Sequence, residues 1–271
     1  MTGRDHPGPP TGIDTSRPNP ARVYDALLGG KDHYPVDRAA ADAILNVAPQ
    51  ACRGARENRA FLRRAVRYLA EAGIHQFLDI GTGLPTQGNV HQIAQAVTPH
   101  ARVAYVDHDP VVHVHANALL ADHTTTIAAL ADLREPEVIL GHPDIRRLLD
   151  LTQPIAILLV AVLHFIRDEE DPAGIVARLR EAMAPGSFLV LSHATGDFHP
   201  QAGAKVTKVY QQASAPLLLR SHAQIARFFD GFDLVAPGLV EPAAWRPDPE
   251  GPTKPSAGGF YSGVGRRSAG R

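Results

Sequence analysis

The stretch Phe77-Leu-Asp-Ile-Gly-Thr-Gly83 decides the fold, because it joins a short apolar run to an acid and two closely spaced glycines. The apolar run, residues 76–80, has the length and composition of a buried β-strand. Glycines at positions 81 and 83 permit a tight turn after the strand and let backbone N–H groups approach a ligand without a Cβ in the way. A glycine pair also occurs in ordinary strand-to-helix turns, so the loop by itself leaves a purely structural role open.

Downstream of this loop, short apolar runs alternate with helical patterns. We predict strands at residues 76–80, 102–106, 125–129, 155–160 and 188–192, separated by helical segments at 89–97, 110–120, 135–150 and 172–183. This alternation indicates a parallel sheet with helices on both faces, and fully apolar strands fit burial on both faces. We then expect an inserted helix over residues 200–220, a helix at 221–229, and strands at 233–235 and 259–264. The fold class is therefore α/β.

The first quarter of the chain contains no predicted strand. Residues 1–17 lack periodicity and include a cluster of prolines and glycine, so we expect a disordered tail. Helical patterns follow at residues 20–28, 36–47 and 56–72. We therefore divide the chain into a disordered tail (1–17), a helical prefix (18–73) and an α/β domain (74–271).

The composition argues against several classes of protein. The formal net charge of the 271 residues is −1, which favours neither nucleic acid nor an anionic membrane as a partner. We see no apolar signal-peptide segment, and no run approaches the ~20 apolar residues of a membrane span. The single cysteine and the fourteen histidines form no spacing typical of a metal site. We expect a cytoplasmic protein without metal, nucleic-acid or membrane partners, and leave its oligomeric state open.

The glycine loop favours a ligand without phosphates. A dinucleotide fingerprint needs a third glycine three residues after Gly83, where this chain has Thr86. S-adenosylmethionine carries no phosphate and does not need that glycine. The acid at Asp79 also fits a ligand that bears an ammonium group. Gly81, Gly83 and Asp79 are therefore candidate S-adenosylmethionine-binding residues.

Two further acids follow the next two predicted strands. Asp107 ends the second strand, where a carboxylate can accept hydrogen bonds from both ribose hydroxyls. Asp109 precedes Pro110 and fits a helix N-cap instead. Asp132 follows the third strand and can accept from the adenine amine while the backbone N–H of Leu133 donates to a ring nitrogen. Asp132 alone could equally be a helix cap, but three acids at three successive strand ends favour a nucleoside site.

These segments resemble a known class of proteins. The stretches Phe77 to Gly83, Tyr105-Val-Asp-His-Asp-Pro110 and Ala131-Asp-Leu-Arg134 resemble the first three cofactor motifs of class I methyltransferases. Three other segments resemble an actinobacterial S-adenosyl-methyltransferase family of unassigned substrate: Ala21-Arg-Val-Tyr-Asp-Ala-Leu-Leu-Gly-Gly-Lys-Asp32, Arg56-Glu-Asn-Arg59 and Val162-Leu-His-Phe-Ile166. The resemblance implies a Rossmann-like sheet of seven strands with the last antiparallel, and places His108 at the cofactor site. The chain departs from the class at Leu84-Pro85, where a further glycine is usual.

The helical prefix is denser in aromatic and charged residues than a simple covering helix requires. We predict that it folds over the strand ends as a lid, with Tyr24 and Lys31 near the methionine end of the cofactor or near the methyl acceptor. The alternative is a helical hairpin that covers one sheet edge. The two readings differ in whether residues of the prefix line the cofactor site.

Methyl transfer to a small-molecule acceptor is the expected function. A general base is needed only if the acceptor must lose a proton; His164, after the fourth strand, is the first candidate and His193, after the fifth, the second. Either histidine could instead be structural. No Asn-Pro-Pro-Tyr-type element follows the fourth strand, which disfavours amino groups of nucleobases as acceptors. The alternatives are a nicotinamide-dependent oxidoreductase and a non-catalytic S-adenosylmethionine-binding sensor.

Overall fold

The computed structural model describes residues 14–85, 88–122, 124–248 and 258–268, and in this part of the chain seven strands form one mixed sheet in the order β3-β2-β1-β4-β5-β7-β6. The strands are β1 (Gln76–Ile80), β2 (Arg102–Asp107), β3 (Thr126–Leu130), β4 (Ala156–Val160), β5 (Phe188–Ala194), β6 (Asp233–Leu234) and β7 (Phe260–Arg266). Strands β1 to β5 pair in parallel, whereas β7 runs antiparallel to both β5 and β6. The predicted α/β class and the antiparallel last strand are confirmed.

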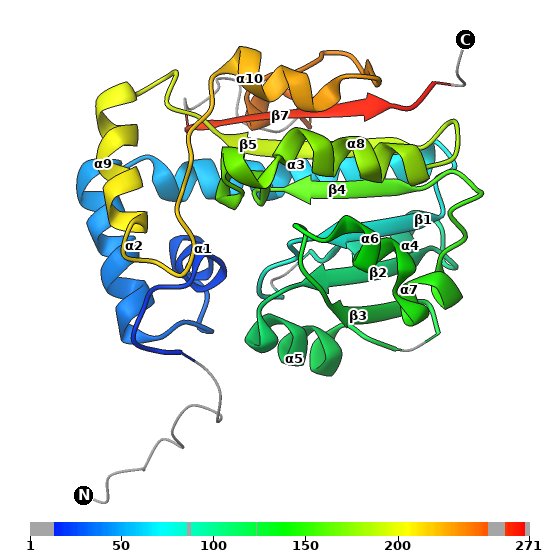
Figure 1. Ribbon diagram of the computed structural model, residues 1–271, viewed down its shortest axis with the longest axis horizontal. Helices are drawn as coiled ribbons and strands as arrows, with labels where there is room; N and C mark the ends of the chain where they lie inside the picture. Colours follow the sequence, from blue (N-terminus) through cyan, green and yellow to red (C-terminus); the bar gives the residue numbers. More distant parts are fainter. Residues whose placement is uncertain (1–13, 86–87, 123, 249–257, 269–271) are drawn as a thin grey trace, which may run out of the picture.

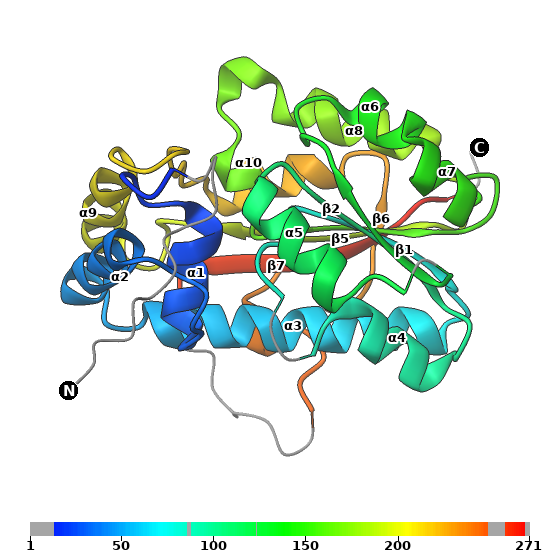
Figure 2. The ribbon, with the colours of Figure 1, turned by 90° about the horizontal axis from the view of Figure 1, so that it is seen from below.

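The central strands are apolar on both sides because helices cover both faces of the sheet (Figure 2). Phe77 of β1 packs in one core cluster with residues of α3 (Ala51–Glu71), α4 (Val90–Val97) and α5 (Pro110–Leu119). Its neighbours Leu78 and Ile80 pack in the opposite cluster. The helices on that second face are α6 (Pro136–Gly141), α7 (Pro143–Leu148), α8 (Pro172–Ala182) and α10 (His222–Ala226). Successive strand residues thus serve opposite layers, as the pleat requires.

The predicted helical prefix divides between two places. α3 lies against the sheet, where Phe61, Ala65 and Leu69 are fully buried. α1 (Pro20–Leu28) and α2 (Pro35–Val47) instead pack with α9 (Pro200–Tyr210) in a separate apolar cluster. Figure 1 shows these three helices beyond the ends toward which the parallel strands point. The chain therefore covers the carboxyl edge of the sheet with segments that lie more than 150 residues apart.

Most predicted elements agree with the structure to within two residues, and two differ more. α3 begins at Ala51, five residues before the predicted start at 56, because Ala51 and Ala55 supply a further apolar turn that packs near α1. The inserted helix ends at Tyr210, and residues 211–220 cross the carboxyl edge as a strap without helix. The backbone of the strap forms hydrogen bonds to other segments: Ser214 N donates to Pro18 O, and Leu218 N donates to His164 O.

The structure describes the start of the chain only from residue 14. The predicted disordered tail falls mostly on residues 1–13, which lie outside the described residues, as does Thr86. Residues 14–17 lie beside α1, where Arg22 donates to the carbonyl oxygens of Asp14 and Arg17. Among the described residues, no helix is both long and apolar enough to cross a membrane.

Candidate functional site

A cavity of about 380 Å³ opens at the carboxyl ends of the parallel strands. Its wall combines the loops that follow β1 to β5 with residues of α1, α2, α3 and α9. Open α/β sheets bind ligands at this edge, and a volume of several hundred cubic ångströms is typical of a small-molecule site. The fold thus forms a ligand-sized space where the predicted acids lie.

The loop after β1 needs glycine for two different reasons. Gly81 and Gly83 have φ values of +74° and +66°, in the left-handed region that residues with a Cβ rarely adopt. A Cβ at Gly81 would also collide with the side chain of Val162, which follows β4. At Gly83, in contrast, a Cβ would meet no atom within 4 Å, so the space beside it is open to the cavity.

Asp107 is held in place by the glycine loop. Gly83 N donates to Oδ2 of Asp107 at 2.9 Å, and Asp109 N donates to Oδ1 at 3.0 Å. Burial raises the pKa of Asp107, and the two backbone hydrogen bonds and His108 act against that rise. His108 Nδ1 lies 3.6 Å from Asp107 Oδ1, and both residues line the cavity. The carboxylate is fixed but still faces the cavity.

Asp79 lines the cavity at the end of β1 and is 6% exposed. Burial raises its pKa to about 7, while the guanidinium of Arg59 lowers it and the carboxylate of Asp107 raises it. A buried carboxylate with a pKa in this range binds a cation strongly only after it has lost its proton. Asp79 therefore places in the cavity wall a titratable carboxylate that binds a cation when it is ionised.

Asp132 lies at the cavity wall after β3, and its carboxylate is already engaged. Nη2 and Nε of Arg134 donate to it at 2.7 and 3.0 Å. Partial burial raises the pKa of Asp132, but the hydrogen bonds and charge of Arg134 outweigh burial and hold the pKa below its usual value. Arg134 also reaches Glu170 at 3.2 Å. Leu133 is buried and lines the same wall.

The prefix brings Tyr24 to the cavity but not Lys31. The Tyr24 hydroxyl donates to Ala55 O and accepts from Asn58 Nδ2, both at 3.0 Å. Lys31 is exposed and does not line the cavity. Asp25 holds the turn that contains Lys31, because its carboxylate accepts from Asp32 N.

Sequence reasoning missed two residues of α3 that line the cavity, Asn58 and Arg59. Asn58 is fully buried, and its Oδ1 has no hydrogen-bond partner among the described residues. A buried acceptor without a partner is rare in proteins and indicates a missing donor. The signal was present in the Arg56-Glu-Asn-Arg59 segment, which served only for the resemblance.

His164 presents a proton to the cavity instead of a basic nitrogen. Ala194 N donates to His164 Nδ1 at 3.2 Å, so the neutral ring carries its proton on Nε2. Burial, together with His193 and Arg220, lowers the pKa of His164 well below its usual value and keeps the ring neutral. His164 lines the cavity and is 3% exposed. The base role predicted for it does not follow from this geometry.

His193 is closed off from the cavity wall. Its Nε2 accepts from Arg220 at 2.9 Å, so the proton lies on Nδ1, which donates to Ala194 O at 2.7 Å. Burial lowers the pKa of His193 to about 3. Both ring nitrogens have protein partners, which gives His193 a structural role.

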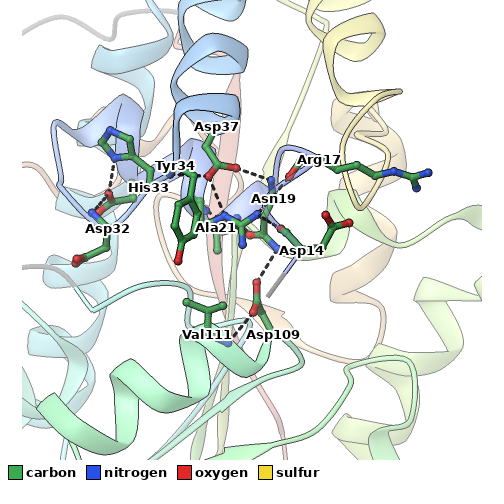
Figure 3. A network of polar contacts seen from close by, with 12 residues as sticks. Asp14, Arg17, Asn19, Ala21, Asp32, His33, Tyr34, Asp37, Asp109 and Val111 are labelled. Atoms are coloured by element: carbon green, nitrogen blue, oxygen red, sulfur yellow. Dashed lines mark hydrogen bonds and ion pairs between the residues drawn. The ribbon is translucent and has the colours of Figure 1, made fainter. Parts of the chain in front are cut away.

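A buried polar network ties α1 to the cofactor edge of the sheet (Figure 3). Asn19 caps α1 through its side-chain oxygen, and its Nδ2 donates to Asp109 at 2.7 Å across 90 residues of sequence. Asp109 also caps α5 at Val111 N. Asp37 joins the network by accepting from Asn19 N and from Arg22. α1 is therefore fastened directly beside Asp107.

Comparisons with known proteins decide the family. A match to the S-adenosyl methyltransferase family covers residues 7–268. The chain belongs to the S-adenosyl methyltransferase family. It is an enzyme that uses S-adenosylmethionine as its methyl donor. No curated protein matches the chain.

Two solved structures are similar to this methyltransferase over nearly its whole length, and a third shares its fold. A DUF574-family protein from Streptomyces avermitilis is 44% identical, with a TM-score of 0.89 over 94% of this chain and 99% of that one. A Thermobifida fusca protein described as a candidate methyltransferase is 44% identical, with a TM-score of 0.90 over 97% and 100%. The N-methyltransferase NodS from Bradyrhizobium japonicum, solved with S-adenosylhomocysteine, is 14% identical and shares the fold, with a TM-score of 0.50 over 92% and 100%. The oxidoreductase and sensor alternatives gain no support.

The cavity fits this cofactor by its own chemistry. The open space beside Gly83 admits a ligand to the loop backbone. Asp79 and the unpartnered Oδ1 of Asn58 are acceptors for an ammonium group. Within the described residues, no group of three or more metal-ligating side chains is present. These acceptors therefore suit a cationic ligand that joins a nucleoside to an amino acid.

Proposed function

We propose that this methyltransferase acts on a small-molecule acceptor inside the cavity, and that Asp79, Asp107 and Asp132 hold the cofactor. The observation that carries the proposal is the arrangement of these three carboxylates. They lie at the carboxyl ends of three adjacent strands and line a single cavity with the glycine loop. A nucleoside with an attached amino acid offers hydroxyls, an amine and an ammonium group to such a row of acceptors.

The nucleoside end is assigned to β2 and β3. Asp107 accepts from the ribose hydroxyls, because Gly83 and Asp109 fix its carboxylate while it still faces the cavity. His108 lies beside it on the wall. Asp132 accepts from the adenine amine, and the Leu133 backbone N–H donates to the ring. Arg134 sets the orientation of Asp132 for this contact.

The methionine end is assigned to β1 and α3. Asp79 and Asn58 Oδ1 accept from the ammonium group, which supplies the donor that Asn58 lacks. Tyr24 holds the Asn58 amide in that orientation by accepting from Nδ2. Lys31 leaves the proposed set because it lies outside the cavity.

α1 acts in this proposal as a lid over the nucleoside end. Asn19, Pro20 and Tyr24 line the cavity, and the Asn19–Asp109 hydrogen bond closes α1 onto the strand edge. A ligand held beneath α1 leaves only after this contact opens. The lid also excludes water from the site, which strengthens the electrostatic contacts inside.

S-adenosylmethionine supplies a methyl group that is already activated on a sulfonium. The protein's own residues then have to hold the two reactants in line and exclude water, and heavy acid–base chemistry is not required. His164 contributes an Nε2–H donor that orients the acceptor. A proton lost by the acceptor is released to solvent when the site reopens after transfer, because His164 Nε2 is already protonated.

Calorimetry with S-adenosylhomocysteine tests the cofactor assignment. The wild-type chain binds it, and Asp132→Ala weakens binding while Asp144→Asn does not, because Asp144 pairs with Arg147 on the surface far from the cavity. Equal affinities for the two variants would contradict the adenine assignment. Absence of binding to the wild-type chain would contradict the proposed site as a whole.

A further inference from the structure

The cavity has a second side whose chemistry differs from the row of acids. Over β4 and β5, its wall is formed by α1, α2, α9 and the strap, and it is largely apolar. The side chains concerned come from five separate segments: Leu27, Ile44, Phe165, Val206, Tyr210 and Leu217. Such a surface binds an apolar molecule by removing both from water. This apolar side is not needed for the nucleoside assigned to β1 to β3.

The apolar side offers aromatic rings to a ligand. Phe165 and Tyr210 lie with ring centroids 5.7 Å apart and planes tilted by 45°. His164 meets Phe165 at 4.4 Å and Phe260 at 6.0 Å, both edge to face. Aromatic walls of this kind favour flat rings, which gain offset-stacked or edge-to-face contacts beyond the area they bury.

Two charged groups near the apolar side, Asp25 and Arg220, are already committed to the protein. Asp25 accepts from Asp32 N and lies 3.0 Å from His33 Nδ1. Arg220 donates to the carbonyl oxygens of Leu163 and Ile166 and to Asp168. A charged acceptor group placed beside Asp25 or Arg220 would therefore lose its hydration without gaining a counter-ion, which is costly.

The Nε2–H of His164 remains available as a hydrogen-bond donor on this side. Nδ1 is taken by Ala194 N, and Nε2 has no partner among the described residues. The strap holds the ring in place, because Leu218 N bonds to the His164 carbonyl and Arg220 bonds to the carbonyls on either side. A fixed, neutral donor at an apolar wall selects a ligand with an accepting oxygen or nitrogen.

We propose that the methyl acceptor is an uncharged aromatic molecule that packs against Phe165 and Tyr210 and accepts a hydrogen bond from His164 Nε2 through an oxygen atom. This inference rests on the proposed function, since it assumes that the cofactor occupies the row of acids. It names the substrate class and gives His164 the task of orienting the acceptor. The ring lies on the β4–β5 side, with its reacting atom toward Asp79.

Three probes test the proposal on the full chain saturated with S-adenosylhomocysteine. 2-Naphthol is aromatic, neutral and bears an oxygen; 2-naphthoate is aromatic and anionic; cyclohexanol is neutral but not aromatic. We expect calorimetry near neutral pH to give 2-naphthol an affinity at least about tenfold above either other probe, since a missing counter-ion or ring contact costs about this factor. Equal or tighter binding of 2-naphthoate, or no binding of 2-naphthol, would overturn the proposal.

A matched pair of variants tests the role of His164. Asn in place of His164 keeps an acceptor near the Nδ1 position for Ala194 N–H and removes the Nε2–H, whereas Gln keeps a donor near the Nε2 position. We expect His164→Asn to weaken 2-naphthol binding about fivefold to tenfold and His164→Gln to recover part of it, with S-adenosylhomocysteine affinity unchanged in both. Unchanged 2-naphthol affinity in both variants would refute the donor role.

The two levels of the proposal fail in different ways. If S-adenosylhomocysteine does not bind the wild-type chain, the proposed function falls, and the acceptor inference falls with it. If it binds and the probe preference is reversed or absent, only the acceptor inference falls.

Discussion

The two sides of the cavity are built by different means. The acid side takes its residues from the ends of β1, β2 and β3, three adjacent parallel strands whose positions the sheet fixes. The apolar side collects residues from α1, α2, α9, the loop after β4 and the strap. The first side is thus a property of the sheet, and the second depends on segments added before and after it. We infer that the row of acids is set by the sheet and that the acceptor side is set by the added segments.

The largest effect is expected where the added segments are fastened to the sheet. Arg220 is 5% exposed. It donates to two backbone carbonyl oxygens and also to the side chains of His193 and Asp168. Arg220→Ala leaves these acceptors without their donor, and we expect it to lower the free energy of unfolding by about 4 kcal/mol. Urea denaturation measures this loss. Arg227→Ala, at an exposed position, serves as the control and should change stability by less than about 0.5 kcal/mol.

Asp107→Ala tests the acid side. The substitution removes a carboxylate that accepts from two ribose hydroxyls in the proposed complex. Two hydrogen bonds to a charged group correspond to about a hundredfold loss of S-adenosylhomocysteine affinity. Calorimetry measures it, with Asp144→Asn as the surface control. An affinity within about threefold of wild type would contradict the assignment of the ribose hydroxyls to Asp107.

The pH dependence of cofactor binding isolates Asp79. Its pKa is raised to about 7, and an ammonium ligand requires the ionised carboxylate. We expect S-adenosylhomocysteine affinity to rise about tenfold from about pH 6 to about pH 8, and Asp79→Asn to remove most of that rise. The stability of the fold depends on pH in the opposite direction. Burial favours the protonated form of Asp79 in the folded chain, so its contribution to the free energy of unfolding falls as the pH rises from the ordinary pKa of an aspartate toward 7. Affinity that falls with pH would refute the ammonium assignment.

The smallest effect concerns the lid. Asn19→Ala removes the α1 cap and the hydrogen bond to Asp109, each of which contributes about 1 kcal/mol. We expect S-adenosylhomocysteine to dissociate about fivefold faster in stopped-flow experiments, because α1 opens more often. Asp14 lies in the same segment, and among the described residues its side chain bonds only to Ser16, so Asp14→Ala should leave dissociation unchanged. Equal rates in both variants would favour the alternative in which α1 and α2 only cover a sheet edge.

The sequence predicted the acid side well because its signals are local. A strand end, a glycine pair and an acid lie within a few residues, so Asp79, Gly81, Gly83, Asp107 and Asp132 could be named without knowing the fold in detail. The structure places all five on the wall of one cavity. Their contacts with the cofactor stay predictions, as do the cytoplasmic location and the absence of nucleic-acid partners.

The apolar side could not be predicted in the same way. Whether a leucine of α1 meets one of the strap depends on tertiary packing, which local patterns do not encode. Lys31 does not line the cavity: Asp25 of α1 holds the turn that contains Lys31, through a contact with Asp32 N that no periodic pattern signals. The donor that occupies His164 Nδ1 could not be predicted for a related reason, since the Ala194 N–H belongs to β5, thirty residues further along the chain.

A crystal structure of the full chain with S-adenosylhomocysteine tests the central claim most directly. The account predicts the ribose at Asp107, the adenine at Asp132, the amino group beside Asp79 and Asn58, and the sulfur facing the apolar side near His164. A nucleoside bound against α9 and the strap, or outside the cavity, would contradict it.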